Sequence, residues 1–430
     1  MSHRERKPVL PYHFNLLWVG HATSQLGDYV ALFAVLFFVK DQITEEPFWL
    51  GLVFAAETLP GVIFGLSSGL VIDRLSRRFL MISTDLVRSA AFIALALLSG
   101  AMVLRDRPLP VVAIAVVFGA MASVFRSALT AYLPSIVSRE QLASANARLS
   151  VTGQTFFILG PLLAGTLIAT VGYPVAFGLN AATFLVSAAT TLLLPKDDPR
   201  GRTSDTGWKS EMAAGFDVLW TDTRLRLTTL GAFVSNFVSA FFESSLVLLS
   251  VVLFGLSNSI ETSQLYSALG VGGVLGALSA VWAVQHLGLG RVFSAGLLIW
   301  GGGFALMTYA DSIGGALFLF ALTGFGLPWV AVATATIRQK VTPDAYLGRV
   351  DAAAKAMVGF ALPVGAIALT YLASRIDSVR PGTGVLTVAR YAPLLLVGTA
   401  ILLLLTSLRT VGTDPVPLPI VTERARGKDL

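Results

Sequence analysis

The stretch GLVIDRLSRR, residues 69–78, places one acid and three arginines between two long apolar runs. FWLGLVFAAETLPGVIFGLSS precedes it, and FLMISTDLVRSAAFIALALLSGAMVL follows it. Each run is long enough to cross the roughly 30 Å hydrocarbon core of a bilayer as an α-helix. Charge confined to so short a gap is typical of a cytoplasmic turn between two membrane spans.

The whole chain repeats this pattern. Apolar residues make up 55% of it and charged residues only 13%, whereas soluble domains carry about 25% charged residues. A lipid-exposed backbone must satisfy its own hydrogen bonds, so the spans are predicted to be helices. We expect twelve spans, at residues 13–38, 47–72, 79–104, 109–133, 150–170, 174–194, 227–254, 263–286, 291–310, 313–337, 350–373 and 388–408.

Basic residues fix the orientation of these spans. With the N-terminus inside, 22 of the 31 Lys and Arg residues fall in cytoplasmic segments and 6 in external loops. This asymmetry follows the positive-inside rule and predicts that both chain ends are cytoplasmic.

One long polar loop, residues 195–226, divides the chain into an N-terminal bundle, 1–194, and a C-terminal bundle, 227–430. Within it, apolar residues recur at spacings of four and form one helical face, at Trp208, Met212, Phe216 and Trp220. This helix is expected to lie on the membrane surface or to pack against the inner end of a bundle. Six spans plus six indicate an all-α membrane protein with a substrate route between two bundles.

Three acids are predicted near the middle of the bilayer: Asp28, Glu57 and Glu243. An ionised side chain there costs about 2.5–3.5 kcal/mol, so such residues are functional candidates by default. Spans 1 and 7 carry matching polar stripes, His21, Gln25 and Asp28 on one and Asn236, Ser239 and Glu243 on the other. Both stripes are expected to face one central cavity, because exposing polar side chains to lipid costs free energy.

A carboxylate that alternates between a proton and a cationic substrate would couple the two fluxes. Each acid has a second interpretation, a structural hydrogen bond. Arg126, in the inner half of span 4, is a further candidate for substrate or proton binding, or it would reach towards the interface and pair with Glu57 or Asp85. Lys355 is expected to reach the interface or to pair with Asp351 one turn earlier.

The charges around the opening stretch suggest a cytoplasmic gate. Asp73 lies at the cytoplasmic end of a span, where an acid is expected to have a partner. Asp85 and Arg88 lie one to two turns into the next span. Such a cluster would bridge the bundles in one conformation and break in the other. The alternative is that the arginines only signal topology.

These residues resemble a known family signature. Gly69, Asp73, Arg74, Arg77 and Arg78 form G-x-x-x-D-R-x-x-R-R, which resembles the loop 2–3 motif of the major facilitator superfamily. The resemblance covers the whole chain and implies that this cluster stabilises the outward-facing state. Ser76 replaces the usual glycine, and the second-half repeat, HLGLGRV, keeps only Arg291 of the charges, so the resemblance implies an asymmetric gate.

Other segments resemble one branch of that superfamily, the bacterial exporters of macrolides, other drugs and enterobactin-type siderophores. They are QLGDYVALFAV, ASANARLSVTGQTFFILGPLLAG and TPDAYLGRV. Gly160, Pro161 and Gly165 resemble the antiporter element G-P-x-x-G-G, with Ala164 in place of one glycine. The alternative for this element is an ordinary packing kink.

The sequence carries no signature of an enzyme. It contains no Cys, no phosphate-binding P-loop and four His without metal-ligand spacing, so we expect no catalytic residue, metal or cofactor and a proton or other ion gradient as driving force. The expected protein is a monomer in the bacterial cytoplasmic membrane that exports small lipophilic or cationic compounds by proton antiport, with the bilayer and protons as partners and no nucleic acid. The alternatives are an exporter or flippase of an amphiphile, such as a siderophore or lysophospholipid, and a receptor or scaffold without transport.

Overall fold

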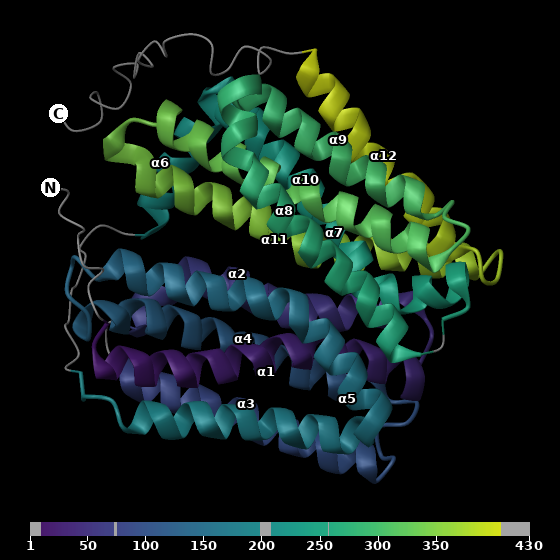
Figure 1. Ribbon diagram of the computed structural model, residues 1–430, viewed down its shortest axis with the longest axis horizontal. Helices are drawn as coiled ribbons and strands as arrows, with labels where there is room; N and C mark the ends of the chain where they lie inside the picture. Colours follow the sequence, from purple (N-terminus) through teal and green to yellow (C-terminus); the bar gives the residue numbers. More distant parts are fainter. Residues whose placement is uncertain (1–9, 73–74, 198–207, 257, 406–430) are drawn as a thin grey trace, which may run out of the picture.

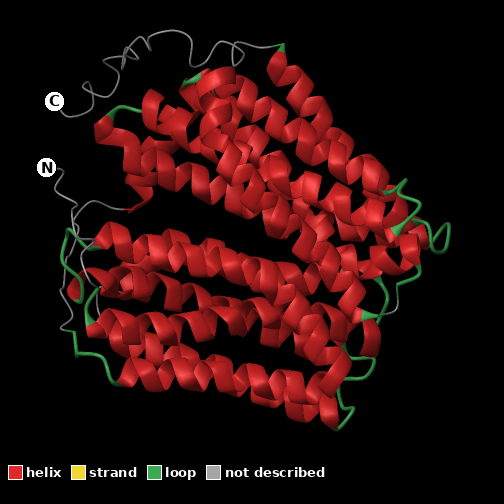
Figure 2. Ribbon diagram, viewed as in Figure 1, coloured by secondary structure: helices red, strands yellow, loops and turns green. Residues whose placement is uncertain are grey.

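The computed structural model describes residues 10–72, 75–197, 208–256 and 258–405, and these residues fold almost entirely into helices (Figure 2). Eleven helices within this part of the chain are long and apolar enough to cross a membrane. The helices are α1 Tyr12–Gln42, α2 Pro47–Ile72, α3 Arg77–Gly100, α4 Pro108–Tyr132, η1 Leu133–Ser135, α5 Leu142–Leu192, α6 Trp208–Thr221, α7 Thr223–Phe254, α8 Ser259–Leu287, α9 Leu289–Met307, α10 Ile313–Val341, η2 Asp344–Tyr346, α11 Leu347–Asp377 and α12 Gly384–Leu404.

Helix α5 supplies two of the expected spans. Its backbone leaves the helical region at Gly172, where φ is 75° and ψ is 172°. Glycine adopts this positive φ without the steric cost that a side chain would impose, and Pro174 follows with no N–H to donate. With α5 divided at Gly172, the described helices give the twelve spans that the sequence predicts.

The helices form two bundles, α1–α5 and α7–α12, which diverge at the end where α6 lies and meet at the other end (Figure 1). One buried apolar core, which includes Phe37 of α1 and Phe242 of α7, is shared by both halves at the closed end. At the α6 end each half keeps a separate core, around Phe14 in one and Leu219 in the other. Apolar packing therefore joins the halves at one end only.

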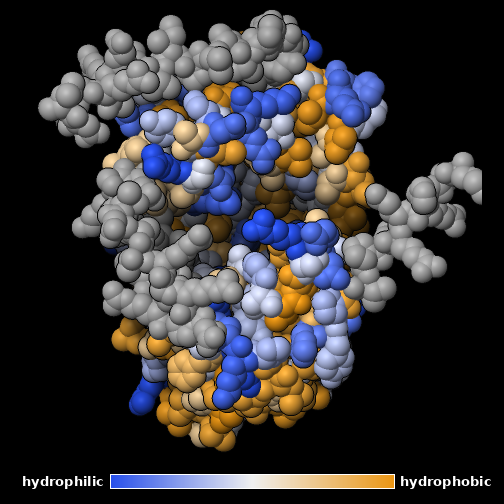
Figure 3. All heavy atoms as spheres, turned by 90° about the vertical axis from the view of Figure 1, so that its left-hand side faces the viewer, coloured by the Kyte–Doolittle hydropathy of each residue, from blue (hydrophilic) through white to orange (hydrophobic). Residues whose placement is uncertain are grey.

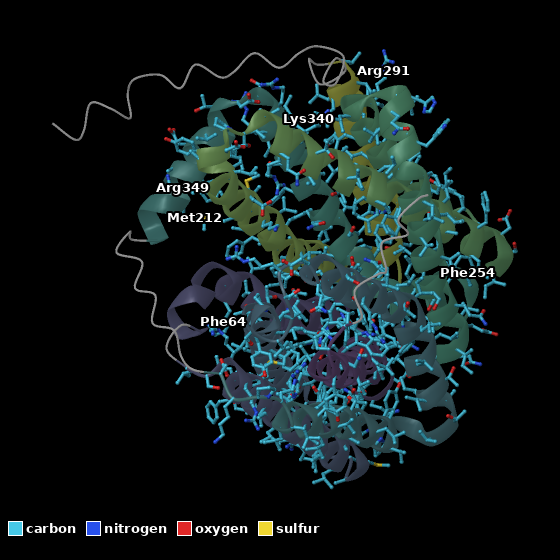
Figure 4. All side chains as sticks on the ribbon, turned by 60° about the vertical axis from the view of Figure 1, so that its left-hand side comes forward. Phe64, Met212, Phe254, Arg291, Lys340 and Arg349 are labelled. Atoms are coloured by element: carbon cyan, nitrogen blue, oxygen red, sulfur yellow. The ribbon has the colours of Figure 1, made fainter. Side chains whose placement is uncertain are left out.

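Helix α6 packs against the C-terminal half. Met212 and Phe216 contact the core that contains Ile337 and Val350. Glycine is required at 215, because a Cβ there would overlap the carbonyl oxygen of Arg349. Figure 4 shows Met212 and Arg349 together on this half. The apolar face of α6 therefore packs against the end of a bundle, which is the second of the two placements expected from the sequence, and does not lie on the membrane surface.

The structure describes the side chain of one of the two tryptophans on the apolar face of α6. Trp220 is 49% exposed, so it does not take part in the packing against the C-terminal half. The side chain of Trp208 lies outside the described residues.

Two seams hold the halves together at the closed end. On α8, the Ser259 hydroxyl donates to the carbonyl oxygen of Gly165 at 2.8 Å, and the Ser267 hydroxyl donates to that of Ile158 at 2.8 Å. On the opposite side, the backbone N–H of Phe48 at the start of α2 donates to the hydroxyl oxygen of Ser374 on α11 at 3.1 Å.

The antiporter-like element forms part of the first seam. A Cβ at Gly165 would overlap Ser263 and the carbonyl oxygen of Ser259 on α8, and a Cβ at Gly160 would meet Tyr29 of α1 at 2.5 Å. Pro161, between them, lacks a backbone donor. The small residues therefore allow α5 to approach both its own half and the opposite half.

We expect Gly165→Ala to push α5 away from α8, because the added methyl group has no space at the seam. The variant should favour the conformation that is open at this end. The chain has no native cysteine, so Ala122→Cys in the cavity described below can report directly: its labelling by a membrane-impermeant thiol reagent in inverted vesicles should fall. Gly178→Ala on the same helix is the control, because a Cβ there has nothing within 4 Å. Equal labelling in both variants would contradict this role of the seam.

Candidate functional site

A cavity of about 740 Å³ lies between the halves and opens at the α6 end. Its walls come from α2 and α4 on one side and from α11 and α6 on the other. Figure 3 views this end and shows the recess between the halves, with hydrophilic residues along its border. With the orientation that the basic residues predict, the structure is open to the cytoplasm.

Glu57 and Arg126 line the N-terminal wall of this cavity. Helices α2 and α4 are in van der Waals contact at Glu57, because Gly119 has no side chain to hold them apart. The Arg126 guanidinium lies 3.6 Å from where a Cβ of Gly61 would be. Among the described residues, no ion pair joins Arg126 to Glu57 or Asp85, so the pairing alternative for Arg126 does not hold in this conformation.

The opposite wall carries charges that are already paired. Asp351 accepts from Arg338 of α10 at 2.5 Å and from Lys355 at 2.7 Å. The expected pairing of Lys355 with Asp351 is confirmed, and the Lys355 side chain stays 74% exposed.

Glu243 lies in a second and much smaller cavity, of about 70 Å³. Its lining is mostly apolar and comes from both halves, and eight of its residues are aromatic: Tyr29, Phe33, Phe157, Phe242, Tyr266, Trp300, Phe304 and Phe320. The Tyr266 hydroxyl donates to the backbone carbonyl oxygen of Glu243 at 2.8 Å, and its ring lies 4.5 Å from that of Phe33. No ion pair to the Glu243 carboxylate occurs among the described residues.

The third acid, Asp28, belongs to a charge network inside the N-terminal half. Arg88 of α3 is fully buried and binds Asp28 at 2.7 Å, and it also binds Asp85. The Ser24 hydroxyl accepts from the same guanidinium at 3.1 Å. The rings of Phe125 and Phe184 contact it at 4.7 and 4.5 Å. Asp28 therefore makes a structural contact with the protein, which is the second of the two roles that the sequence suggests for each acid.

In this conformation, Asp85 and Arg88 pair with each other and with α1 in the interior of one half and do not reach the other half among the described contacts. Their expected role in a cytoplasmic gate stays a prediction for the outward-facing state. The expectation that the two polar stripes line one cavity is not met. Asn236 donates to the carbonyl oxygen of Val358 at 3.1 Å and lines a separate cavity of about 370 Å³.

The other polar residues of the α1 stripe pack inside the N-terminal half. His21 stacks on Phe125, and Gln25 lies against Gly153.

The start of α3 is held by a residue that the sequence did not single out. Asp197, just after α5, accepts from the Ser76 hydroxyl at 2.6 Å and from the N–H groups of Arg77 and Arg78 at 2.8 and 3.1 Å. Arg78 in turn donates to the carbonyl oxygens of Thr191 and Leu192 at the end of α5. In this conformation, these contacts stay within one half.

Partial burial raises the pKa of Asp197, but the hydrogen bonds from Ser76 and the two N–H groups lower it further, so that it stays below its ordinary value. Of the remaining gate residues, Gly69 lies on α2, in a segment whose side chains are not described. Asp73 and Arg74 fall outside the described residues.

Met212, Tyr266 and Asp197 are the functional candidates that sequence reasoning missed. Met212 was placed on an apolar face, yet it also lines the large cavity. Tyr266 gave no signal in a chain with nine tyrosines. Asp197 lies in a polar linker, where an acid is unremarkable until its partners on α3 are known.

Comparison with known proteins now adds to this geometry. The family model of the Major Facilitator Superfamily matches residues 17–284, which are more than half of the chain. The chain belongs to this superfamily. It is a multi-pass membrane transporter and not an enzyme, and it handles a small-molecule substrate.

Relatives point to efflux. Macrolide efflux protein A of Streptococcus pyogenes is 25% identical over 395 residues, which cover 89% of this chain and 95% of that protein. The enterobactin exporter EntS of Citrobacter koseri is 26% identical over 361 residues, covering 82% of each chain.

Solved structures share the fold. The nucleoside transporter NupG superposes with a TM-score of 0.74 at 14% identity, covering 92% of this transporter and 99% of that chain. A bacterial homologue of the human lysosomal transporter Spinster, in an inward-facing and unoccupied conformation, gives 0.69 at 13% identity, covering 92% and 94%.

We expect Arg88→Met to lower the free energy of unfolding by about 3–5 kcal/mol, because it leaves the fully buried Asp85 and the partly buried Asp28 without their shared cation. Arg126→Met is the matched control: its side chain is exposed in the cavity, so the change should stay within about 0.5 kcal/mol. Reversible unfolding of the purified variants measures both. A mild effect at Arg88 would show that the network contributes little to stability.

We expect Asp197→Asn to lower the unfolding temperature at pH 7. A carboxylate whose pKa is lowered on folding stabilises the protein above its unfolded pKa of about 3.9, and this stabilisation disappears as the pH falls further. The difference from the wild type should therefore shrink below about pH 4. Asp311→Asn, at an exposed acid, should show no difference at either pH. A difference at Asp197 that is constant with pH would contradict the role of its charge.

Proposed function

We propose that this transporter exports lipophilic compounds that carry a basic group, by proton antiport across a bacterial cytoplasmic membrane. It works as a monomer, by alternating access, and a proton or other ion gradient supplies the driving force without a cofactor. The relatives named as macrolide efflux protein and enterobactin exporter support the direction.

The observation that carries this proposal is the position of Glu243. Glu243 lines a cavity with eight aromatic residues, which both halves build, and no described residue forms an ion pair with it. A carboxylate among aromatic faces favours an organic cation, because the rings attract it through their quadrupoles while the acid supplies the counter-charge. The apolar lining favours a lipophilic body.

The proton flux and the substrate flux are coupled because protons and the substrate cation compete for the same acids. Glu57 in the large cavity and Glu243 in the small one each hold a proton or face a substrate cation, and not both. Exchange of one proton for one monovalent cation moves no net charge across the membrane, so the pH gradient drives it. One pH unit supplies about 1.4 kcal/mol, which corresponds to a tenfold concentration ratio of the substrate.

The conformational cycle exchanges which end is sealed. The seams of α5 with α8 and of α2 with α11 open, and the separate inner cores approach each other. The contacts that the structure describes for Arg77 and Arg78 lie within their own half, and in the outward-facing state these side chains meet the other half.

We expect Glu243→Gln to reduce pH-gradient-driven export of a lipophilic cation, such as tetraphenylphosphonium, by at least about tenfold, because a charge-assisted contact is lost. Transport into inverted vesicles with and without an imposed pH gradient measures this. Glu57→Gln should also weaken the dependence on the gradient.

Glu140→Gln, in an exposed loop, is the control and should export like the wild type. If both cavity variants keep the wild-type dependence on the gradient, these acids do not couple the fluxes. Absence of counterflow by the wild type in proteoliposomes would instead favour the receptor or scaffold alternative.

A further inference from the structure

The large cavity presents two opposite charges without protein partners on the same wall. Glu57 and Arg126 both line it, and neither has an ion pair among the described residues. On the facing wall, Asp351 is already satisfied by Arg338 and Lys355. A molecule that enters from the α6 end therefore meets one available carboxylate and one available guanidinium.

The local packing holds these groups close together. Gly119 lets α4 touch the backbone of α2 at Glu57, and Gly61 leaves room for the Arg126 guanidinium one turn further along α2. One helical turn rises about 5.4 Å. The wall is thus complementary to a cation and an anion that are separated by about one turn.

We propose that the substrate of this cavity has a dipolar head, with an ammonium group at Glu57 and a carboxylate or phosphate at Arg126. The planar guanidinium fits both anions, since it can donate two parallel hydrogen bonds to either. An apolar body would lie against Val62, Ala122, Ala356, Leu362 and Met212, which line the same cavity. The inference rests on the proposed export function and adds the anionic group to the substrate.

Closure of the cavity gives the physical reason for this preference. When the walls approach, water leaves, and a charge without a partner becomes costly. A purely cationic substrate neutralises Glu57 and leaves Arg126 unpaired, whereas a dipolar substrate neutralises both. A dipolar head therefore allows closure with no stranded charge on this wall.

Three probes with the same eight-carbon tail test the inference: octyltrimethylammonium, octyl phosphate and octylphosphocholine. Binding to the purified full-length transporter in nanodiscs is measured by calorimetry. The wild type should bind the dipolar probe about tenfold more tightly than either singly charged probe. Arg126→Gln should remove this advantage over the cation, and Glu57→Gln should remove it over the anion.

The opposite shifts of the two variants separate recognition from a structural role. A variant that only loosened the fold would weaken all three probes together, and this result would overturn the inference. Arg126→Lys, which keeps the charge but not the planar fork, should retain part of the preference. Glu140→Gln, at an exposed acid outside the cavity, should retain all of it.

The dipolar head could belong to a membrane lipid or to a water-soluble compound. A lysophosphatidylcholine with a long acyl chain, supplied in the vesicle bilayer, competes against octylphosphocholine supplied in water. Competition by the bilayer probe assigns the site to a lipid headgroup, and its failure assigns the site to a soluble amphiphile.

Binding and transport can fail separately. Loss of gradient-driven export in the wild type would refute the antiport proposal while leaving the probe preference intact. Equal affinity for the cationic and dipolar probes, with export intact, would refute the dipolar head alone.

Discussion

A charge inside a bilayer must have a partner or face water, and this constraint separates the charged residues of the transporter into two groups. Arg88, Asp28 and Asp85 satisfy one another in the interior of the N-terminal half, where aromatic rings flank the guanidinium. Glu57, Arg126 and Glu243 form no ion pair within the described part of the chain and line cavities instead. The first group makes one half rigid, since breaking a buried network costs several kcal/mol. The second group is available to cargo.

The same division between rigid and available parts extends to the packing. Each half has its own core at the α6 end, while the two halves share a core at the other. A rocking motion can therefore exchange the sealed end without disturbing the interior of either half. The seam that must open is made of hydroxyl-to-carbonyl bonds between small residues, such as Ser259 to Gly165. Such bonds can be replaced by water when the helices separate, so parting α5 from α8 breaks no ion pair among the described residues.

The sequence alone predicted the spans, their division into two halves and the three buried acids, because hydropathy and the insertion cost of charge act locally. It could not predict pairing. Asp28 and Glu57 look alike in sequence, yet one binds Arg88 and the other faces a cavity, since the difference depends on how α1 packs against α3. The periodicity placed Asn236 and Glu243 on one stripe, but seven residues separate them by about 10 Å along α7, and they line different cavities. Asp197 became visible only through its bonds to the start of α3.

The two halves use equivalent helices for different tasks. In the six-plus-six arrangement, α2 and α4 correspond to α8 and α10, and both pairs pack through glycines: Gly119 against Glu57 in one, Gly272 against Ala321 and Gly324 against Leu269 in the other. Only the first pair carries charges at this depth. On α8 and α10, the corresponding surface contributes Tyr266, Leu269 and Phe320 to the aromatic cavity. Close packing is thus a property of the shared fold, whereas the charges at these helix pairs belong to α2 and α4. The C-terminal half carries its cavity-lining acid on α7 instead, at Glu243. The α2–α4 pair is suited to bind a polar group of a substrate, and the α8–α10 pair supplies apolar surface for its body.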